Sequence, residues 1–205
     1  MKTRKEKISI AVLAGGKSSR MGSNKALLTI DGLTIIEHTL QTARHFSADC
    51  FVITNSPDKF VFLNTPLYPD SIKSIGPLAG IFTALSHAQH SKCLVLACDL
   101  PFLGKKSLQI LTEDVGEEEM LAFKTSQRIE PICAVYSKKA IVKVKEAIDV
   151  QDYSAQNLAN RLDARTLNWH DLSNEFDENA LFNMNAPEDF EHAKTIIDSR
   201  KQKQK

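Results

Sequence analysis

Short, almost entirely apolar runs alternate along the chain with longer segments in which apolar residues recur every three or four positions. Three of the apolar runs are typical of strands covered on both faces: Ile8 to Leu13, Cys50 to Thr54 and Cys93 to Ala97. Two helical patterns separate them, at Thr34 to Phe46 and at Gly76 to Gln89. Strands that alternate with helices in this order predict a parallel sheet joined by right-handed crossovers.

The second half of the chain has a less regular pattern. Further strands are expected at Leu121 to Phe123, Ile132 to Tyr136 and Thr166 to Trp169. Further helices are expected at Lys138 to Ile148, Tyr153 to Leu162 and Pro187 to Ile197. The predicted class is α/β, with three layers in a Rossmann-like arrangement: a mostly parallel central sheet and helices on both faces.

The length of 205 residues is enough for a sizeable core, and we expect a single domain over residues 1–198. Residues 199–205 form a basic run with no apolar side chain to dock it, which predicts a flexible, solvated tail. We find no internal repeat and no low-complexity linker in the sequence.

The formal net charge is +1, so the chain lacks the basic excess typical of proteins that bind nucleic acid or anionic membranes, and neither partner is expected. The four cysteines lie mostly in apolar runs without the spacing of a metal or redox site, which predicts buried thiols in a reducing compartment. The apolar run near the N-terminus is too short for a signal peptide or a membrane span. A cytoplasmic location is therefore expected.

The most informative segment is LAGGKSSRMGSNK, Leu13 to Lys25, directly after the first predicted strand. Gly15 and Gly16 have no Cβ, so backbone N–H groups there can approach phosphate oxygens closely. Arg20 and Lys25 supply positive charge for several phosphates, although Arg20 could equally pair with a carboxylate and a lone lysine is usually just solvated. Taken together, the loop predicts a nucleotide site.

Two common phosphate-binding motifs do not fit this loop. A Walker A motif that ends at Gly16-Lys17-Ser18 requires glycine at position 11, where the chain has Ala11. A dinucleotide-binding motif requires a glycine two residues after Gly15, where Lys17 stands. The nucleotide site therefore belongs to another class.

Polar residues follow the other apolar strands as well. Because parallel strands end at one edge of a sheet, Gly15, Asn55 and Asp99 are expected to converge on one crevice. Asp99 suits Mg²⁺, which prefers oxygen ligands and bridges to substrate phosphates, but an aspartate after a strand also suits a turn or a helix cap. Asn55 and Asp70 are likewise open between contacts to a base or ribose and ordinary turn positions.

The loop resembles the LAGGxSxRMGxxK signature of nucleotidyltransferases, in the form typical of molybdenum cofactor guanylyltransferases, which attach GMP to molybdopterin. The resemblance covers almost the whole chain in order. Its further segments are Asn55, Asp70, Gly76 to Gly80, Cys98 to Pro101, Glu130 to Tyr136 and Asn183 to Asp189. One departure is Ala186, where the family often has threonine, so a hydroxyl able to cap the closing helix is missing and that helix could begin from Asn185 instead.

The resemblance implies a nucleotidyltransferase fold whose N-terminal half binds the nucleotide and whose C-terminal half binds the acceptor. It implies catalytic roles for Lys25, Arg20 and Asp99, with Asp99 also holding Mg²⁺. The implied nucleotide-binding residues are Leu13, Ala14, Gly15, Gly16, Lys25, Asn55, Asp70 and Asp99. The implied acceptor-binding residues are Gly76, Pro77, Leu78, Gly80, Asn183 and Asn185. From the residues alone, Gly76 and Pro77 equally suit the start of a helix.

The implied reaction is transfer of GMP from GTP to the terminal phosphate of molybdopterin or its molybdenum-loaded form, with release of pyrophosphate. The implied partners are GTP, molybdopterin and a protein that inserts molybdenum or acts as a chaperone for a molybdoenzyme. Two alternatives stay open. One is a different donor and acceptor, such as CTP with molybdopterin, or a nucleotide with a sugar phosphate or phospholactate; the other is a nucleotide-binding protein without catalytic activity.

Overall fold

A central sheet forms the middle layer of the molecule in a computed structural model, which describes residues 7–15, 24–113, 115–126, 128–172, 177 and 179–203. Within these residues seven strands pair in the order β5-β4-β1-β6-β8-β7-β9. Their bounds are β1 Ile8–Leu13, β4 Cys50–Ile53, β5 Leu67–Tyr68, β6 Lys92–Ala97, β7 Met120–Lys124, β8 Ile129–Ser137 and β9 Ala164–Asn168. Strand β8 runs antiparallel to β6 and β7, and the other pairings are parallel. The predicted mostly parallel sheet is confirmed.

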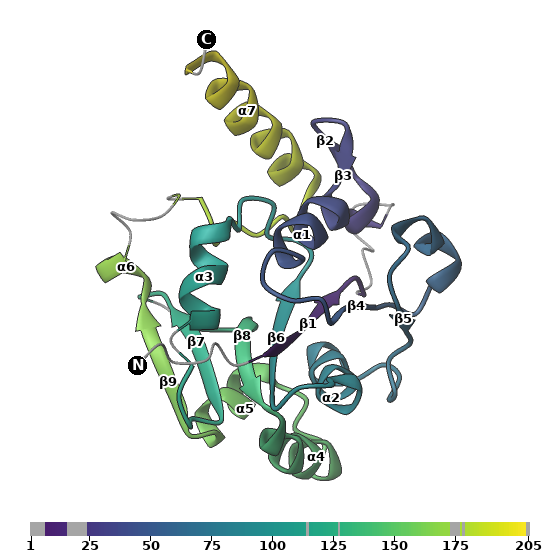
Figure 1. Cartoon of the computed structure of the whole chain (residues 1–205), viewed down its shortest axis with the longest axis vertical. Coiled ribbons are helices and arrows are strands. Elements are labelled where there is room, and N and C mark those ends of the chain that lie inside the picture. The colour runs from purple at the N-terminus through teal and green to yellow at the C-terminus, as the bar shows by residue number, and fades with distance from the viewer. Residues whose placement is uncertain are drawn as a thin grey trace.

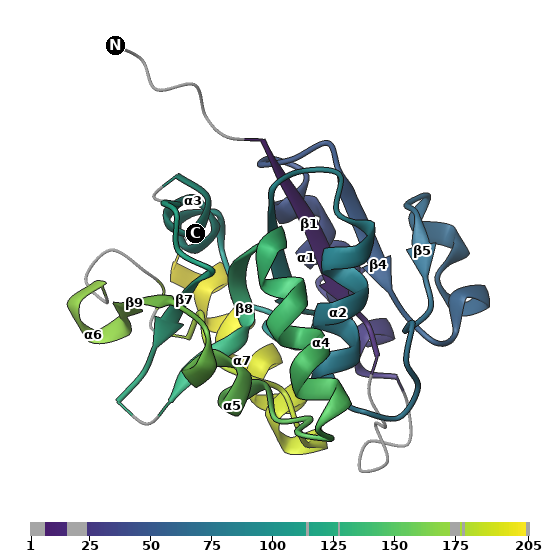
Figure 2. The same cartoon turned by 90° about the horizontal axis from the view of Figure 1, so that it is seen from below.

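Helices cover both faces of this sheet, as Figures 1 and 2 show from two directions. The helices are α1 Ile35–Ala43, α2 Pro77–His87, α3 Lys105–Glu113, α4 Ile141–Asp149, α5 Ala155–Arg161, α6 Trp169–Leu172 and α7 Pro187–Lys203. Helices α2, α4 and α5 lie on one face, and α1 and α3 lie on the other. The three-layer prediction is therefore confirmed.

Alternation along β1 explains why two cores form. Ala11 faces the core under α2, where it packs with Leu78 and Ile81. Ile10 points to the opposite face and joins the core that α3 covers with Leu108 and Leu111. Because both faces are buried, the strand is apolar except for Ser9, whose hydroxyl accepts from the His90 N–H, and the functional groups collect at the end of the strand.

Helix α1 begins at Ile35 because Thr34 and Glu37 form a reciprocal cap. The Thr34 Oγ accepts from the Glu37 N–H, and the Glu37 carboxylate accepts from the Thr34 N–H at 2.8 Å. A two-stranded hairpin, β2 Thr29–Ile30 and β3 Leu33–Thr34, precedes the helix and was not predicted. Its turn residues Asp31 and Gly32 have positive φ values of 54° and 81°, the conformation that an Asp-Gly hairpin turn adopts.

The prediction that the last helix ends at Ile197 is wrong, whereas the flexibility expected for residues 199–205 stays a prediction. Helix α7 continues to Lys203 and passes the expected domain boundary. The Arg200 guanidinium pairs with the Asp177 carboxylate at 2.6 Å and lies 4.7 Å from the centre of the Phe102 ring. A charged side chain docks this segment where the sequence offers no apolar one.

All four cysteines are buried and free, as predicted, and burial raises the pKa of the Cys50 thiol to about 11.

In the part of the chain that the structure describes, no helix has the length and apolar character needed to cross a membrane.

Candidate active site

Strands β1, β4 and β6 end level with one another, and this alignment brings three loops together. Leu13 is paired in register with Ile53 on one side and with Ala97 on the other. Backbone hydrogen bonds continue past the strands, from the Ala14 N–H to Ile53 O at 2.9 Å and from the Cys98 N–H to Leu13 O at 3.2 Å. The loops that carry Gly15, Asn55 and Asp99 therefore leave the same edge of the sheet, as predicted.

Lys25, Asp99 and Asn185 form a cluster from three distant parts of the chain. The Lys25 Nζ donates to the Asn185 Oδ1 at 3.1 Å and lies 3.8 Å from the Asp99 Oδ2. Both charged side chains are mostly buried, with 18% of the Lys25 and 20% of the Asp99 side chain exposed. Lys25 begins a short 3₁₀ helix, Lys25–Leu27, which is capped by the side chain of Asn24: the Asn24 Oδ1 accepts from the Ala26 N–H at 3.1 Å.

The segment from Asn183 to Asn185 lies directly against Asp99. The Met184 N–H donates to the Asp99 backbone oxygen at 3.0 Å, and the Met184 side chain is fully buried. This anchor fixes an extended chain, so Asn183 and Asn185 flank a buried methionine. The predicted acceptor-binding asparagines are thus brought to the carboxylate that was predicted to hold metal.

Burial raises the pKa of the Asp99 carboxyl; Lys25 partly offsets this effect and Glu130 adds to it. Glu130 belongs to this edge because β8 is antiparallel, so the strand starts where β6 ends. No local pattern predicts this placement of Glu130, since the reversal of β8 depends on tertiary pairing. Glu130 itself accepts from the Arg128 Nε at 3.0 Å.

Two oxygens at this position have no hydrogen-bond partner among the described residues. They are the Asp99 Oδ1 and the Asn183 Oδ1, both buried. Buried polar atoms are nearly always hydrogen-bonded. Two buried oxygens without a partner, one of them on the carboxylate that faces Lys25, therefore indicate a place where a ligand binds. One carboxylate oxygen and one amide oxygen are donors that Mg²⁺ prefers, so the donor set fits this metal, which usually keeps several waters.

Asn55 and Asp70 bind one another across the gap between two loops. The Asn55 Nδ2 donates to the Asp70 Oδ2 at 2.7 Å, and the Asp70 N–H donates to the Asn55 Oδ1 at 3.1 Å. Burial raises the pKa of the Asp70 carboxyl, and the hydrogen bond from Asn55 lowers it in part. Asn55 therefore orients Asp70 and leaves the Asp70 Oδ1 without a hydrogen bond from Asn55.

The segment from Gly76 to Gly80 combines a turn with the start of α2. Gly76 has φ 68° and ψ −150°, a conformation available almost only to glycine, and it precedes Pro77 at the first position of the helix. The α2 N-terminus has no side-chain cap. Its N–H groups are thus available to an anion or to the polar edge of a base.

Two predicted acceptor residues have packing roles. The Leu78 side chain is fully buried in the core beneath α2, and the predicted contact of Leu78 with an acceptor stays a prediction. Gly80 is also buried, and a Cβ there would lie 3.0 Å from the side chain of Leu13. Gly80 thus lets the helix approach β1, and the Leu13 side chain packs against it rather than reaching a nucleotide.

The remaining predicted residues lie in and beside the glycine-rich loop. Gly15 is exposed, whereas Ala14 is buried and its N–H is already bonded to β4. Gly16 and Arg20 lie outside the described residues, so their predicted contacts with phosphate stay predictions.

The start of α7 shows how the missing threonine is compensated. The Asp189 carboxylate accepts from the N–H groups of Asn185 and Ala186 at 2.7 and 2.8 Å. This is one half of a capping box, and it holds the chain next to the Lys25 contact of Asn185. The prediction that the Asn185 side chain could start the helix is not confirmed, because its Oδ1 accepts from Lys25 instead.

A mostly parallel sheet, a glycine-rich loop after its central strand and a lysine–aspartate pair at the carboxyl edge together define a nucleotidyltransferase of the Rossmann-like class. The chain belongs to the family of MobA-like NTP transferase domains, whose model matches residues 10–166.

Individual relatives agree with this assignment. The chain is 34% identical to a probable molybdenum cofactor guanylyltransferase of Carboxydothermus hydrogenoformans, over 91% of this chain and 94% of the relative. It is also 34% identical to a protein of the same name from Aquifex aeolicus, over 69% and 70% of the two chains. The structure is similar to that of molybdopterin-guanine dinucleotide biosynthesis protein A from Archaeoglobus fulgidus, with a TM-score of 0.80, 26% identity and coverage of 93% and 99%.

Proposed function

We propose that the protein transfers GMP from GTP to the terminal phosphate of molybdopterin and releases pyrophosphate. The observation that carries this proposal is the cluster of Lys25, Asp99 and Asn185, which joins the nucleotide half to the acceptor half at one edge of the sheet. The relatives named as molybdenum cofactor guanylyltransferases support guanine as the base and molybdopterin as the acceptor.

The reaction needs no protein nucleophile, because the acceptor phosphate already carries a nucleophilic oxygen. The oxygen forms a bond to the α-phosphorus of GTP while the bond to the β-phosphate oxygen breaks, and pyrophosphate leaves. Alignment of the two phosphates and compensation of their negative charge supply most of the catalysis. The protein therefore needs fixed positive charge and rigid positioning at the reacting phosphorus.

Among the described residues, Lys25 provides the fixed positive charge at this site. Its ammonium group is already held by Asn185 and Asp99, so it needs little reorganisation to neutralise charge that develops on the leaving pyrophosphate. In the absence of phosphates, this charge is balanced by Asp99. Arg20 would add a second cation, and Gly15 and Gly16 would offer backbone N–H groups to the phosphates.

We propose Mg²⁺ as the cofactor, held by the Asp99 and Asn183 side-chain oxygens that have no other partner among the described residues. When bound, Mg²⁺ would lower the charge repulsion between the two phosphate-bearing substrates. Asp99 must be ionised to bind it, and Lys25 favours that ionised form.

Guanine recognition is assigned to the loops that Asn55 and Asp70 join. Guanine presents N1–H and N2–H₂ donors on one edge, and the Asp70 carboxylate can accept from them. Adenine lacks this paired donor edge, so the carboxylate discriminates between purines. The acceptor is assigned to Asn183, Asn185 and the start of α2 at Gly76 and Pro77.

The test is pyrophosphate release by the purified protein with Mg²⁺ and each of GTP, CTP, ATP and UTP, with and without molybdopterin released from a molybdoenzyme. Release with GTP that depends on molybdopterin is expected. Release with CTP instead would preserve the chemistry and overturn the guanine assignment. No release with any nucleotide would favour another acceptor or a non-catalytic binding protein.

Two variants tie the activity to this site. Asp99→Asn removes the ionised ligand at nearly constant volume and should lower kcat/KM by about 100-fold or more. Asp58→Asn makes the same change at an exposed aspartate in a 3₁₀ helix, Pro57–Lys59, and should leave the rate unchanged. Equal rates for the two variants would refute the role of Asp99.

A further inference from the structure

Glu130 is a second carboxylate at the edge of the sheet where Asp99 lies, and no step of the proposed reaction uses it. Strands β6 and β8 pair with Leu96 opposite Cys133, so the same register continued by three positions sets Glu130 opposite Asp99. Glu130 is also near enough to raise the pKa of Asp99. The position of Glu130 therefore places it at the site where the substrates meet.

Side chains from elsewhere in the fold hold the backbone on both sides of Glu130. The Gln156 Nε2 of α5 donates to the Ile129 oxygen at 2.6 Å, and the buried Tyr136 hydroxyl donates to the Pro131 oxygen at 2.6 Å. Both hydrogen bonds keep the first residues of β8 in place. Glu130 is thus presented from a rigid element, which suits a group that recognises a substrate.

The Glu130 side chain is mostly buried, but its ion-pair partner is exposed. The exposed fraction is 15% for the Glu130 side chain and 58% for the Arg128 side chain, which pairs with it at 3.0 Å. An ion pair with so exposed a member stabilises the fold little. The Glu130 Oε2 has no hydrogen-bond partner among the described residues. Because burial of one carboxylate beside another costs free energy, this arrangement indicates a function rather than a contribution to stability.

The order of the strands shows which substrate Glu130 can reach. The sheet runs β5-β4-β1-β6-β8, so Asn55 and Asp70, which follow β4 and β5, lie on one side of β1, and Glu130, which begins β8, lies on the other. Guanine is assigned above to the first side. The acceptor segment joins the edge at the end of β6, next to β8, where the Met184 N–H donates to the Asp99 oxygen. Glu130 consequently lies on the acceptor side.

Molybdopterin, the acceptor in the proposed function, offers a carboxylate only one favourable part. Its phosphate and its dithiolene sulfurs carry negative charge, which Glu130 repels. Its pterin ring is a 2-amino-4-oxopteridine, in which N3–H and the exocyclic amino group are two neighbouring donors. The two oxygens of one carboxylate have about four lone-pair sites, of which Arg128 uses one, and they match two parallel donors.

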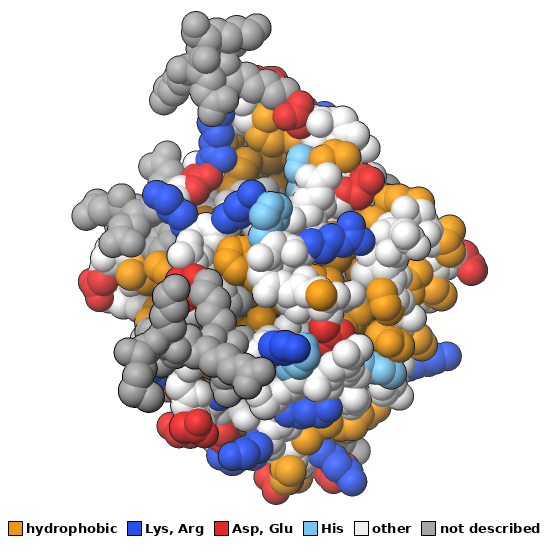
Figure 3. Space-filling model, in the orientation of Figure 1, with side chains coloured by type: hydrophobic (Ala, Val, Ile, Leu, Met, Phe, Trp, Pro, Cys, Tyr) orange, Lys and Arg blue, Asp and Glu red, His pale blue; other side chains and the backbone are white. Residues whose placement is uncertain are grey.

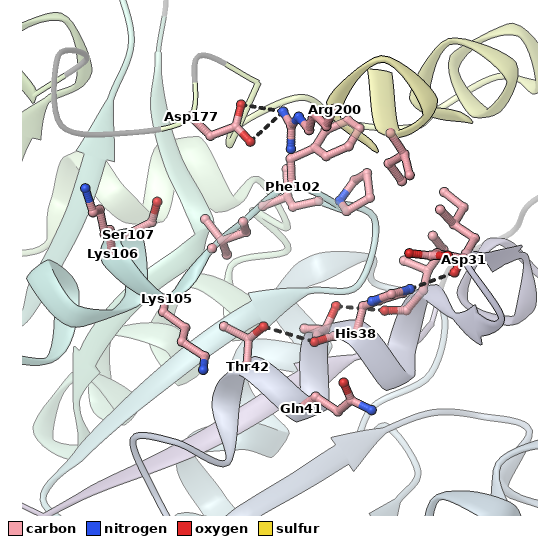
Figure 4. A pocket seen from close by; sticks show the side chains of 18 residues that line it. Asp31, His38, Gln41, Thr42, Phe102, Lys105, Lys106, Ser107, Asp177 and Arg200 are labelled. Atoms are coloured by element: carbon pink, nitrogen blue, oxygen red, sulfur yellow. Dashed lines mark hydrogen bonds and ion pairs between the residues drawn. The ribbon is translucent and has the colours of Figure 1, made fainter. Parts of the chain in front are cut away.

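Two other features of the molecule do not supply this recognition. Basic and acidic side chains are interspersed on the face that Figure 3 shows, so the charge of that face does not select one substrate. The cavity of about 520 Å³ in Figure 4 lies among α1, the segment after Asp99 and α7, and Glu130 does not line it. Recognition of the ring therefore falls to the edge of the sheet.

We propose that Glu130 determines specificity for the acceptor by accepting hydrogen bonds from the N3–H and the 2-amino group of its pterin ring. This inference rests on the proposed function for the identity of the acceptor. Asp70 on one side of β1 and Glu130 on the other then bind the same pair of donors on two different rings, guanine and pterin.

The test is a binding measurement without turnover. The probe is 6-hydroxymethylpterin monophosphate, which joins a pterin ring to one phosphate, and it is titrated into the full-length protein by calorimetry with Mg²⁺. A second titration adds excess GTP analogue with a methylene group between the α- and β-phosphates, which cannot transfer GMP. Saturable binding is expected in both titrations. Absence of saturable binding, or displacement of the probe by the analogue, would overturn the proposal.

A matched probe tests the donor pair on the unmodified protein. The corresponding lumazine phosphate has an oxygen in place of the 2-amino group, so it loses one donor and turns an acceptor toward the carboxylate. It should bind about tenfold or more weakly than the pterin probe. Equal affinities for the two probes would refute recognition of the ring by a carboxylate.

Matched variants locate the recognition. Glu130→Gln keeps the volume but replaces one acceptor oxygen with a donor, and it should weaken binding of the pterin probe by about tenfold or more. Glu146→Gln makes the same change at an exposed glutamate of α4 and should leave the affinity unchanged. Unchanged affinity in Glu130→Gln, or a loss of affinity in Asp70→Asn in its place, would show that Glu130 does not bind the ring.

Kinetics with GTP and molybdopterin separate this role from a role at the metal. Glu130→Gln should raise the KM for molybdopterin and leave the KM for GTP and the Mg²⁺ requirement unchanged. A higher Mg²⁺ requirement with unchanged affinity for the pterin probe would place Glu130 at the metal and overturn the proposal. Absence of turnover in the unmodified protein would contradict the proposed reaction alone, because binding of the pterin probe through Glu130 does not require it.

Discussion

The surroundings of Asp99 disfavour its ionised form in the folded protein, which suits a residue that binds a cation. Its carboxylate is mostly buried, one oxygen has no hydrogen-bond partner among the described residues, and the Lys25 ammonium at 3.8 Å compensates its charge only in part. Burial consequently raises the pKa of Asp99 despite the nearby lysine. A carboxylate that is costly to ionise in the free protein is well suited to gain a cation on binding.

Because burial raises the pKa of Asp99 more than Lys25 lowers it, the effect of Asp99→Asn on the free energy of unfolding should depend on pH. Below the ordinary pKa of 3.8, Asp99 is protonated in both the folded and the unfolded chain. As the pH rises, the unfolded chain releases this proton first, so the parent protein loses stability until the pH passes the raised pKa of the folded state. Asparagine does not titrate and is spared this loss.

The free energy of unfolding of Asp99→Asn relative to the parent should therefore increase as the pH rises above 3.8 and level off beyond the folded-state pKa. Urea unfolding of both proteins from pH 4 to pH 7 without Mg²⁺ measures this difference, and other titrating groups cancel in it. A difference that decreases with pH would show that Lys25 outweighs burial.

Elements whose sequence pattern is long and uniform could be predicted closely. Strand β1 has the predicted bounds because six consecutive residues suit a strand buried on both faces. The hairpin β2–β3 was missed because each strand has two residues, too few for a periodic pattern, although Asp31-Gly32 carries a turn signal. Trp169 starts α6 rather than ending a strand, since its ring packs edge-on against Phe123.

At the start of α2, Gly76→Ala should destabilise the protein by about 1–3 kcal/mol. No atom lies within 4 Å of a Cβ built at Gly76, so the cost comes from its backbone conformation at φ 68° alone. Gly104→Ala is the control, because its nearest neighbour would be 3.9 Å away and its φ is ordinary. Chemical unfolding measures both, and equal stability of the two variants would contradict the assigned conformation.

At the start of α7, Ala186→Thr should stabilise the protein by about 0.5–1 kcal/mol. The Asp189 side chain already accepts from the Ala186 N–H, and the Asp189 N–H lies 3.1 Å from the Ala186 oxygen. A threonine hydroxyl at position 186 would complete the capping box by accepting from the Asp189 N–H. Thermal unfolding compares it with Ala186→Val, which has nearly the same shape without the hydroxyl; equal stability of the two would exclude the cap.

On the scale of the whole molecule, the active site depends on contacts that no local pattern reveals. The convergence of the loops after β1, β4 and β6 follows from parallel strands and was predicted. The contact of Lys25 with Asn185 spans 160 positions, and the placement of Glu130 requires one reversed strand. Both depend on how the C-terminal half folds back onto the edge of the sheet, which local periodicity does not specify.

Helix α7 is part of the C-terminal segment that folds back onto the sheet, and Arg200 holds the C-terminal end of this helix in place. The guanidinium joins Asp177 and the Phe102 ring, so it links the C-terminal helix to the segment that follows Asp99. Arg200→Ala should lower the free energy of unfolding by about 1 kcal/mol, because a half-exposed ion pair and one cation–π contact contribute modestly.

The control is Lys145→Ala, at an exposed lysine without an ion pair in the described residues, and it should lower the free energy of unfolding by less than half as much. Urea unfolding at low and high salt separates the contributions: the ion-pair part of the Arg200 effect should shrink with salt and the ring contact should persist. Equal stability of the two variants would mean that Arg200 does not dock the end of α7, and would support the prediction of a flexible, solvated tail.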